Sequence, residues 1–195
     1  MAVITIHFPL SQDDVAKLRA GDSVLLNGPL LSGRDAAHKR LITCLKDGRP
    51  LPVDLRGETI YYVGPCPTPP GRVIGSAGPT TSGRMDRYTP DLLGQGLRGM
   101  IGKGQRSQVV MDAMKQYSAV YFAALGGAGA LIARSIRGAK VIAYPDLGPE
   151  AIYRLEVVDF PVIVAIDAMG NDLYQFGREE FAKKIPIIDF KGDAV

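Results

Sequence analysis

The sequence predicts an α/β fold, a mixed sheet flanked by helices, in one domain spanning residues 1–195. Runs rich in β-branched and aromatic residues alternate with stretches whose apolar residues recur at helical spacing. No internal repeat and no linker divides the chain. A hydrophobic fraction of 46% with 22% charged residues is ordinary for a globular protein, and 195 residues suffice for one ample core.

The first part of the chain predicts two strands and two helices. Val3–Phe8 alternates and is rich in β-branched residues, so we expect a strand there. Ser11, followed by acidic residues, is a helix start, and Ser23–Gly28 follows as a second strand. The next helix is expected to run to about Lys46. Its predicted buried stripe is Leu41, Cys44 and Leu45.

The middle of the chain predicts a strand at Thr59–Val63. The proline-rich segment 64–70 ends this strand, because each proline ring fixes φ and removes a hydrogen-bond donor. The next expected helix is Gln108–Tyr117, capped by Ser107. The residues expected to face inward on it are Val109, Val110, Met111 and Met114.

The last part of the chain predicts alternating strands and short helices. The expected strands are 119–125, 140–144 and 160–167, and the expected helices are 130–136 and 150–155. Residues 168–172 are interpreted as a hairpin turn leading into a strand at 173–176. A weak strand is expected at Ile185–Phe190.

The stretch Gly75–Ser107 is the first candidate functional segment. Apolar periodicity fails across most of it, while glycines, hydroxyls and cations accumulate. Glycine lets the backbone approach a ligand closely, and Arg84 and Lys103 supply charges suited to carboxylate or phosphate. Long loops without strong structure of their own are usually functional or disordered. The composition favours a site for an anionic ligand.

Arg34 and His38 form the second candidate. They are four residues apart, so on a helix they share one face at its N-terminal end, where unpaired N–H groups favour anions. The cap of this helix is either Ser32 or Asp35. The alternative interpretation is an arginine paired with Asp35 and a histidine on the surface.

Charge and cysteine content exclude several functions. The net charge is +3 with scattered cations, which gives nucleic-acid binding little support, and no apolar run is long enough for a membrane helix. Cys44 and Cys66 have no metal-ligand spacing, so this chain is not expected to hold a zinc or iron–sulfur site. Cys44 is expected in the core. Reduced thiols and the lack of a signal peptide indicate a cytoplasmic protein.

Two glycine motifs imitate nucleotide sites. Gly127–Gly129 follows a strand, but Ile132 occupies the position of the third glycine of a dinucleotide fingerprint, so close packing is the simpler explanation. Gly102-Lys103 imitates a phosphate-binding P-loop. That motif needs glycine where Leu97 stands and a hydroxyl residue where Gly104 stands, so it is rejected.

Several blocks together resemble the β subunit of two-subunit class I fumarate hydratases, which is equivalent to the C-terminal domain of the single-chain enzymes. L(+)-tartrate dehydratase β subunits are similar. The blocks that carry the resemblance are 32–40, 62–67, 78–86, 102–104, Asp167 and 170–172. They stretch over most of the chain.

This resemblance implies a swivelling β/β/α-type domain that closes over an active site shared with a larger α subunit, as in an α2β2 assembly. The α subunit would hold a [4Fe–4S] cluster with one open iron, which acts as a Lewis acid on the substrate. The implied reaction is the reversible hydration of fumarate to malate. The alternatives are tartrate dehydration to oxaloacetate and, outside enzymes, an anion- or nucleotide-binding module.

The resemblance also implies roles for individual residues. It places Thr80 as the base that removes a proton beside a substrate carboxylate. The implied dicarboxylate-binding cations are Arg34, Arg84 and Lys103. A neutral threonine is a poor base, so nearby cations must favour its alkoxide. Thr81 is the alternative to Thr80, since the sequence does not determine which hydroxyl points inward, and His38 is a second candidate for proton handling.

Overall fold

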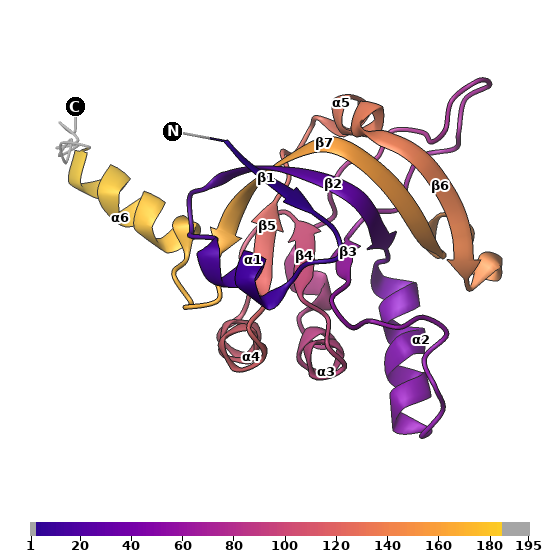
Figure 1. Ribbon diagram of the computed structural model, residues 1–195, viewed down its shortest axis with the longest axis horizontal. Coiled ribbons are helices and arrows are strands. Elements are labelled where there is room, and N and C mark those ends of the chain that lie inside the picture. The colour runs from indigo at the N-terminus through magenta and orange to yellow at the C-terminus, as the bar shows by residue number, and fades with distance from the viewer. Residues whose placement is uncertain (1–2, 185–195) are drawn as a thin grey trace, which may run out of the picture.

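The computed structural model describes residues 3–184, with side chains up to residue 178, and has a seven-stranded mixed sheet at its centre (Figure 1). The strand order is β1-β2-β3-β4-β5-β7-β6, with a further pairing between β2 and β7. The strands are β1 (Ile4–His7), β2 (Ser23–Ser32), β3 (Thr59–Tyr61), β4 (Gly99–Gly102), β5 (Val120–Ala123), β6 (Ile136–Ala143) and β7 (Ile152–Ile166).

Strands β1 to β5 run parallel, and the long strand β7 runs antiparallel to its neighbours. One side of β7 pairs with β2 from Arg154 to Ile163. Its other side pairs with β6 over its first residues and with β5 over its last. The sheet therefore closes on itself through β2, β3, β4, β5 and β7.

The closed sheet divides the interior into two hydrophobic cores. Side chains alternate along the segment that begins with β3: Ile60 and Tyr62 enter one core, whereas Tyr61 and Val63 enter the other. The first core lies under the helices, and the second lies between β3–β5 and the arch of β1, β2, β7 and β6 (Figure 1). The order of layers is thus strand, strand, helix, which agrees with the expected mixed sheet flanked by helices.

The helices are mostly short, and those after β2, β3 and β4 cover one side of the sheet (Figure 1). A reciprocal capping box of Ser11 and Asp14 starts the first, as the sequence predicts. The α-helices are α1 (Gln12–Lys17), α2 (Asp35–Lys46), α3 (Thr89–Gly94), α4 (Gln108–Tyr117), α5 (Gly129–Ile132) and α6 (Leu173–Lys184). The 3-10 helices are η1 (Ser82–Met85), η2 (Ala133–Ser135) and η3 (Pro145–Glu150).

Two predicted elements are wrong, and the stretch Gly75–Ser107, expected to lack strong structure of its own, contains η1, α3 and β4. Residues 150–155 belong largely to β7 rather than to a helix, because β2 and β6 offer hydrogen bonds on both sides and outweigh local helix propensity. Residues 173–176 begin α6 rather than a strand. Asp172, interpreted as a turn residue, accepts a hydrogen bond from the Tyr174 N–H at 2.8 Å and so caps that helix.

Smaller differences concern helix ends and faces. Val109 is 67% exposed, so it does not face inward, whereas Val110, Met111 and Met114 are buried as expected. The N-cap of α2 is Arg34, not Ser32 or Asp35. The predicted helix 130–136 is split between α5 and η2 and ends where β6 begins. The strand expected at Ile185–Phe190 lies outside the described residues.

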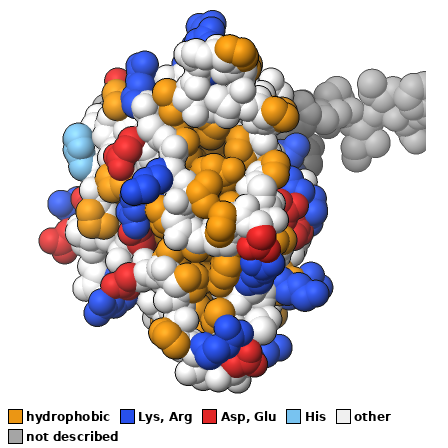
Figure 2. Space-filling view, turned by 90° about the vertical axis from the view of Figure 1, so that its right-hand side faces the viewer, with side chains coloured by type: hydrophobic (Ala, Val, Ile, Leu, Met, Phe, Trp, Pro, Cys, Tyr) orange, Lys and Arg blue, Asp and Glu red, His pale blue; other side chains and the backbone are white. Residues whose placement is uncertain are grey.

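The face that carries β6 and α2 shows a band of hydrophobic side chains (Figure 2). On both sides of the band, lysine and arginine lie next to aspartate and glutamate, so this face has no large field of one sign. None of the helices between residues 3 and 184 has the length and apolar character needed to cross a bilayer.

Candidate functional site

The candidate site lies at the edge of the sheet where four parallel strands end. The C-terminal ends of β2, β3, β4 and β5 meet there, and in both open and closed parallel α/β sheets ligands bind at this edge. Five of the six predicted site residues follow these ends or lie in the segment between β3 and β4. The sixth, His38, lies one turn inside α2.

Thr80, Thr81 and Lys103 are brought together by backbone hydrogen bonds. The Thr80 N–H donates to the Tyr62 carbonyl at 2.7 Å, and the Lys103 N–H donates to the Thr80 carbonyl at 3.3 Å. Thr81 pairs with Lys103 in a parallel bridge, and the Ser82 N–H donates to the Lys103 carbonyl at 2.9 Å. The segment 80–82 thus extends the sheet between the ends of β3 and β4. Thr80 is half-buried, and Thr81 and Lys103 are exposed.

Gly102 makes this close approach possible. A Cβ added to Gly102 would lie 2.0 Å from Ser82 Oγ, which real Cβ atoms essentially never do, and at a tight 3.0 Å from Tyr62 Cδ2. A glycine at the end of β4 is therefore a packing requirement of the site. The glycine-rich composition that drew attention to this stretch has a structural cause at this position.

The two arginines meet at Asp35, in the first turn of α2. Arg84 Nε donates to Asp35 Oδ1 at 3.0 Å, and its Nη2 lies 2.8 Å from Oδ2. Arg34 Nε lies 3.5 Å from the same carboxylate, and its Nη2 lies 2.9 Å from Glu150 Oε1. The pairing of Arg34 with Asp35, foreseen as the alternative interpretation, is present. It also links Arg34 to Arg84.

Glu150 is a site neighbour that the sequence did not indicate. Its Oε2 accepts from the Ala36 N–H at 2.9 Å, so this carboxylate caps the first turn of α2 while its other oxygen holds Arg34. Glu150 ends η3, more than one hundred residues along the chain from Arg34. No local pattern could have predicted the contact, because it depends on how β6 and β7 return past α2.

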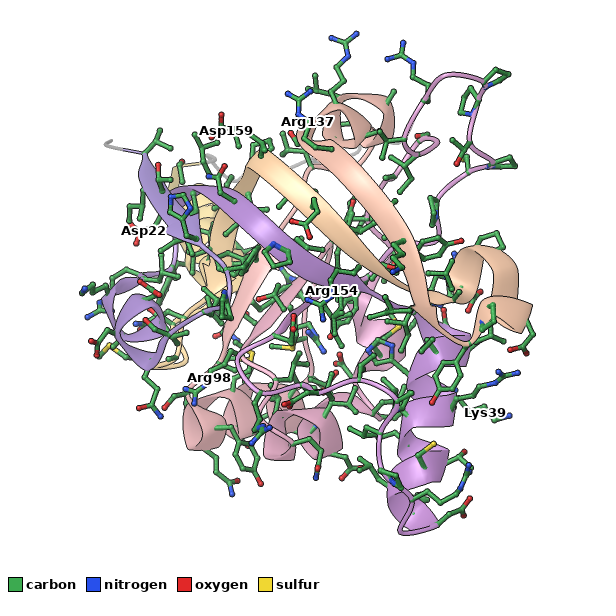
Figure 3. All side chains as sticks on the ribbon, turned by 45° about the vertical axis from the view of Figure 1, so that its right-hand side comes forward. Asp22, Lys39, Arg98, Arg137, Arg154 and Asp159 are labelled. Atoms are coloured by element: carbon green, nitrogen blue, oxygen red, sulfur yellow. The ribbon has the colours of Figure 1, made fainter. Side chains whose placement is uncertain are left out.

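Gly64, just after β3, lies against Arg34. A Cβ at Gly64 would lie 2.9 Å from Arg34 Nη1, so the absence of a side chain there leaves room for the guanidinium. Two other cations near the sheet do not face the site. Arg154 of β7 reaches Glu58, with 3.2 Å between Nη2 and Oε1, and Lys39 lies on the outer side of α2 (Figure 3).

His38 lies beneath the site, not on its surface. Its ring is 1% exposed and meets the Tyr62 ring edge-on, with 5.3 Å between centroids. Nδ1 lies 2.9 Å from the Arg34 carbonyl, which can only accept, so Nδ1 carries the proton and Nε2 is the free base. Burial is the main cause that lowers the pKa of His38 to about 4. The imidazole is therefore neutral at physiological pH, and the surface histidine of the alternative interpretation is wrong.

Arg106 is a buried cation of the stretch Gly75–Ser107 that the sequence did not single out. Its Nε donates to Asp86 at 2.8 Å and its Nη2 donates to Thr89 Oγ1 at 2.8 Å. The guanidinium lies over the rings of Tyr62 and Tyr121, 5.4 and 5.1 Å from their centroids. Asp86, in the same stretch, is thus paired with an arginine. Arg106 is therefore a structural cation below the site.

The site is an open edge and not an enclosed pocket. A hollow of about 770 Å³ lies between α2, α3 and α4, and none of the predicted site residues lines it. Within the described residues no three His, Cys, Asp or Glu side chains gather as metal ligands, and Cys44 is buried while Cys66 is exposed. These residues do not fit an iron–sulfur cluster.

Gly129 serves packing, whereas a Cβ on Gly127, which has a φ of +78°, would meet nothing within 4 Å. A Cβ at Gly129 would lie 2.6 Å from Ser76 Oγ and 2.8 Å from the Gly78 nitrogen. The turn after β5 is therefore pressed against the segment that leads to Thr80. This agrees with the packing explanation and gives a nucleotide no support.

Comparison with known families connects this chain to one group of proteins. The family model described as fumarase C-terminus matches residues 1–177. The chain belongs to the fumarase C-terminus family. The blocks that carried the sequence resemblance all lie within this match.

Several relatives of this fumarase C-terminus chain are much longer than the chain itself. It is 45% identical over 152 residues to the aerobic class I fumarate hydratase of Escherichia coli K12, covering 77% of this chain and 28% of that protein. It is 39% identical over 165 residues to fumarate hydratase 2 of Leishmania major, covering 84% and 29%. The chain thus spans about three-tenths of these fumarate hydratases.

A relative of similar length is the putative L(+)-tartrate dehydratase subunit β of Methanocaldococcus jannaschii. The two chains are 39% identical over 182 residues, which cover 90% of this chain and 91% of the relative. This fumarase C-terminus chain is therefore similar both to one part of longer enzymes and to a whole subunit.

Proposed function

We propose that this chain is the β subunit of a [4Fe–4S]-dependent hydro-lyase that hydrates fumarate to malate reversibly. The observation that carries the proposal is the convergence of Thr80, Thr81 and Lys103 with Arg34 and Arg84 on one open edge. An open edge supports a site that a second subunit completes. The end-to-end similarity to a protein named as a subunit supports a partner of the α type.

The cations of the edge supply the binding chemistry for a small diacid. A guanidinium has five donors, so Arg34 and Arg84 keep N–H groups beyond those that face Asp35 and Glu150. Carboxylates of the diacid would take these donors, with Lys103 adding a point charge. In the described structure Lys103 forms no ion pair, so its charge remains available.

Proton removal in this proposal falls to a threonine hydroxyl. Thr80 is half-buried beside the Lys103 backbone, and a cation near a hydroxyl favours its alkoxide. The same cation stabilises negative charge that develops on the substrate carboxylate. Thr81 is the second candidate for this role. His38 is a neutral base that contacts Tyr62 beneath Thr80, and it holds the Arg34 carbonyl in place.

The cluster belongs to the partner in this proposal, since the described residues lack its ligands. When bound there, it would supply Lewis-acid chemistry at the substrate hydroxyl. This chain then contributes diacid binding and proton transfer. In this proposal, residues of both subunits therefore take part in a single reaction.

Tartrate is the second candidate substrate, and the full-length match to a putative tartrate dehydratase subunit favours it. Tartrate and malate are both diacids, so the same cations serve each. The deciding experiment is an anaerobic assay of this chain co-expressed with its cluster-bearing partner. Turnover of malate and fumarate supports the proposal, turnover of one tartrate enantiomer alone supports the alternative, and turnover of none rejects both.

Variants then test the edge itself. Thr80→Ala should abolish turnover while assembly and the cluster spectrum persist, with Thr81→Ala as the matched control. If Thr81→Ala is the inactive variant, the roles of the two threonines are exchanged. Arg84→Ala and Lys103→Ala should each weaken diacid binding by about 2 kcal/mol, the scale of a lost charge-assisted contact.

A further inference from the structure

The hydroxyl of Tyr121 joins the two segments that carry the proposed base and lysine. Tyr121 lies on β5 with its side chain buried, 2.9 Å from Ser82 Oγ and 2.8 Å from the Gly104 carbonyl. The carbonyl can only accept, so the phenol donates to Gly104 and the Ser82 hydroxyl donates to the phenol. One oxygen atom therefore connects the segment 80–82 with the segment 102–104.

A second tyrosine holds the other side of Gly104. The Gly104 N–H donates to the Tyr174 hydroxyl of α6 at 3.2 Å. Gly104 has a φ of +81°, so the backbone turns through the left-handed region directly after Lys103. Both polar backbone groups of this turn are thus bound by tyrosine hydroxyls from separate elements. The arrangement fixes the direction in which the chain leaves Lys103.

The surroundings of Tyr121 keep its hydroxyl in place and protonated. The guanidinium of Arg106 covers the ring at 5.1 Å, and Arg106 is itself held by Asp86 and Thr89. Burial raises the pKa of the Tyr121 phenol above its usual value, so the hydroxyl stays protonated and remains a donor. Removing this oxygen would leave a buried serine hydroxyl and a carbonyl without their partner, which is costly unless the backbone moves.

We propose that Tyr121 is a positioning residue for the reaction: its hydroxyl sets the spacing between the Thr80–Thr81 hydroxyls and Lys103, and Tyr174 supports the same turn. The inference rests on the proposed function, because only there do Thr80 and Lys103 touch the substrate. Tyr121 itself lies one layer below and does not reach it. A misplacement of about 1 Å in such a site lowers rates by roughly a hundred-fold.

The test uses four variants of the full chain in complex with its partner. Tyr121→Phe removes the shared oxygen, Ser82→Ala removes one of its partners, and the double variant combines them. Tyr174→Phe removes only the bond to the Gly104 N–H. Tyr61→Phe is the control, because Tyr61 is equally buried but its hydroxyl donates to Ala77 in the other core.

Amide hydrogen exchange is the first measurement and needs no activity. Tyr121→Phe should accelerate exchange in peptides covering both 80–82 and 102–105, whereas Tyr174→Phe should accelerate it in 102–105 only. Tyr61→Phe should leave 102–105 unchanged. Unchanged exchange in both segments of Tyr121→Phe overturns the inference, whatever happens to its activity.

Kinetics is the second measurement. Tyr121→Phe should lower kcat/KM roughly ten- to a hundred-fold at an unchanged cluster content. The double variant should be no worse than Tyr121→Phe alone, because both changes remove the same hydrogen bond. Fully additive losses, or a rate within two-fold of wild type, overturn the inference. A wild-type complex without hydro-lyase activity rejects the proposed function instead, while the exchange pattern still decides the role of Tyr121.

Discussion

The buried, neutral His38 predicts a specific loss of stability at mildly acidic pH. In the unfolded chain a histidine binds its proton near pH 6.5, whereas burial lowers the pKa of folded His38 to about 4. Between these values the unfolded state holds one more proton than the folded state. The stability is therefore complete above pH 6.5 and falls as the pH is lowered toward 4.

The size of this effect follows from the two pKa values. A difference of about 2.5 units corresponds to roughly 3 kcal/mol below pH 4, and at pH 5 to about 2 kcal/mol. Two structural features make His38 intolerant of a second proton. Nε2 is buried with no hydrogen-bond partner among the described residues, and the buried Arg106 opposes a positive charge there.

The assay is urea unfolding of the full chain at pH 7.5 and at pH 5.0, for wild type and His38→Gln. Carboxylates also titrate in this range, so the informative quantity is the difference between the two proteins in their pH dependence. Wild type should lose about 2 kcal/mol more than the variant. Equal losses in the two proteins would refute the assignment of His38 as a buried neutral base.

Substitutions of glycine and glutamate residues give three further predictions. Gly102→Ala should destabilise the fold by about 2 kcal/mol in urea unfolding, because its Cβ meets Ser82, whereas Gly177→Ala in α6 meets nothing and should not destabilise it. Gly64→Ala should leave the free energy of unfolding nearly unchanged, but its Cβ should displace the flexible end of Arg34 and raise KM for malate several-fold. An unaltered KM would show that Arg34 does not take part in malate binding. Glu150→Ala should lower the free energy of unfolding by about 1 kcal/mol, and Glu150→Gln should lower it less, since the amide oxygen still accepts from the Ala36 N–H. Equal thermal midpoints for the two variants would contradict the role of Glu150 as a helix cap.

Much of the fold could be predicted because local patterns sufficed. The alternation in β1, the capping box at Ser11 and the apolar stripe of α2 are each contained in a few consecutive residues. The prediction at residues 150–155 was wrong because long-range strand pairing decides the structure there. Residues 150–155 have helix-compatible composition but lie between β2 and β6, which supply hydrogen bonds along both edges.

The candidate site likewise has features that the sequence predicts and features that only the fold decides. Its residue types, glycines beside threonine, arginine and lysine, were determined by the sequence alone, because an anion site needs those donors and that backbone freedom. Only the tertiary structure decided which groups meet. The contacts of Glu150 with Arg34, of Arg84 with Asp35 and of Tyr121 with Ser82 join positions 39 to 116 residues apart, and such contacts arise from packing. Sequence spacing carries no record of them, since they depend on how the closed sheet brings its strand ends to one edge.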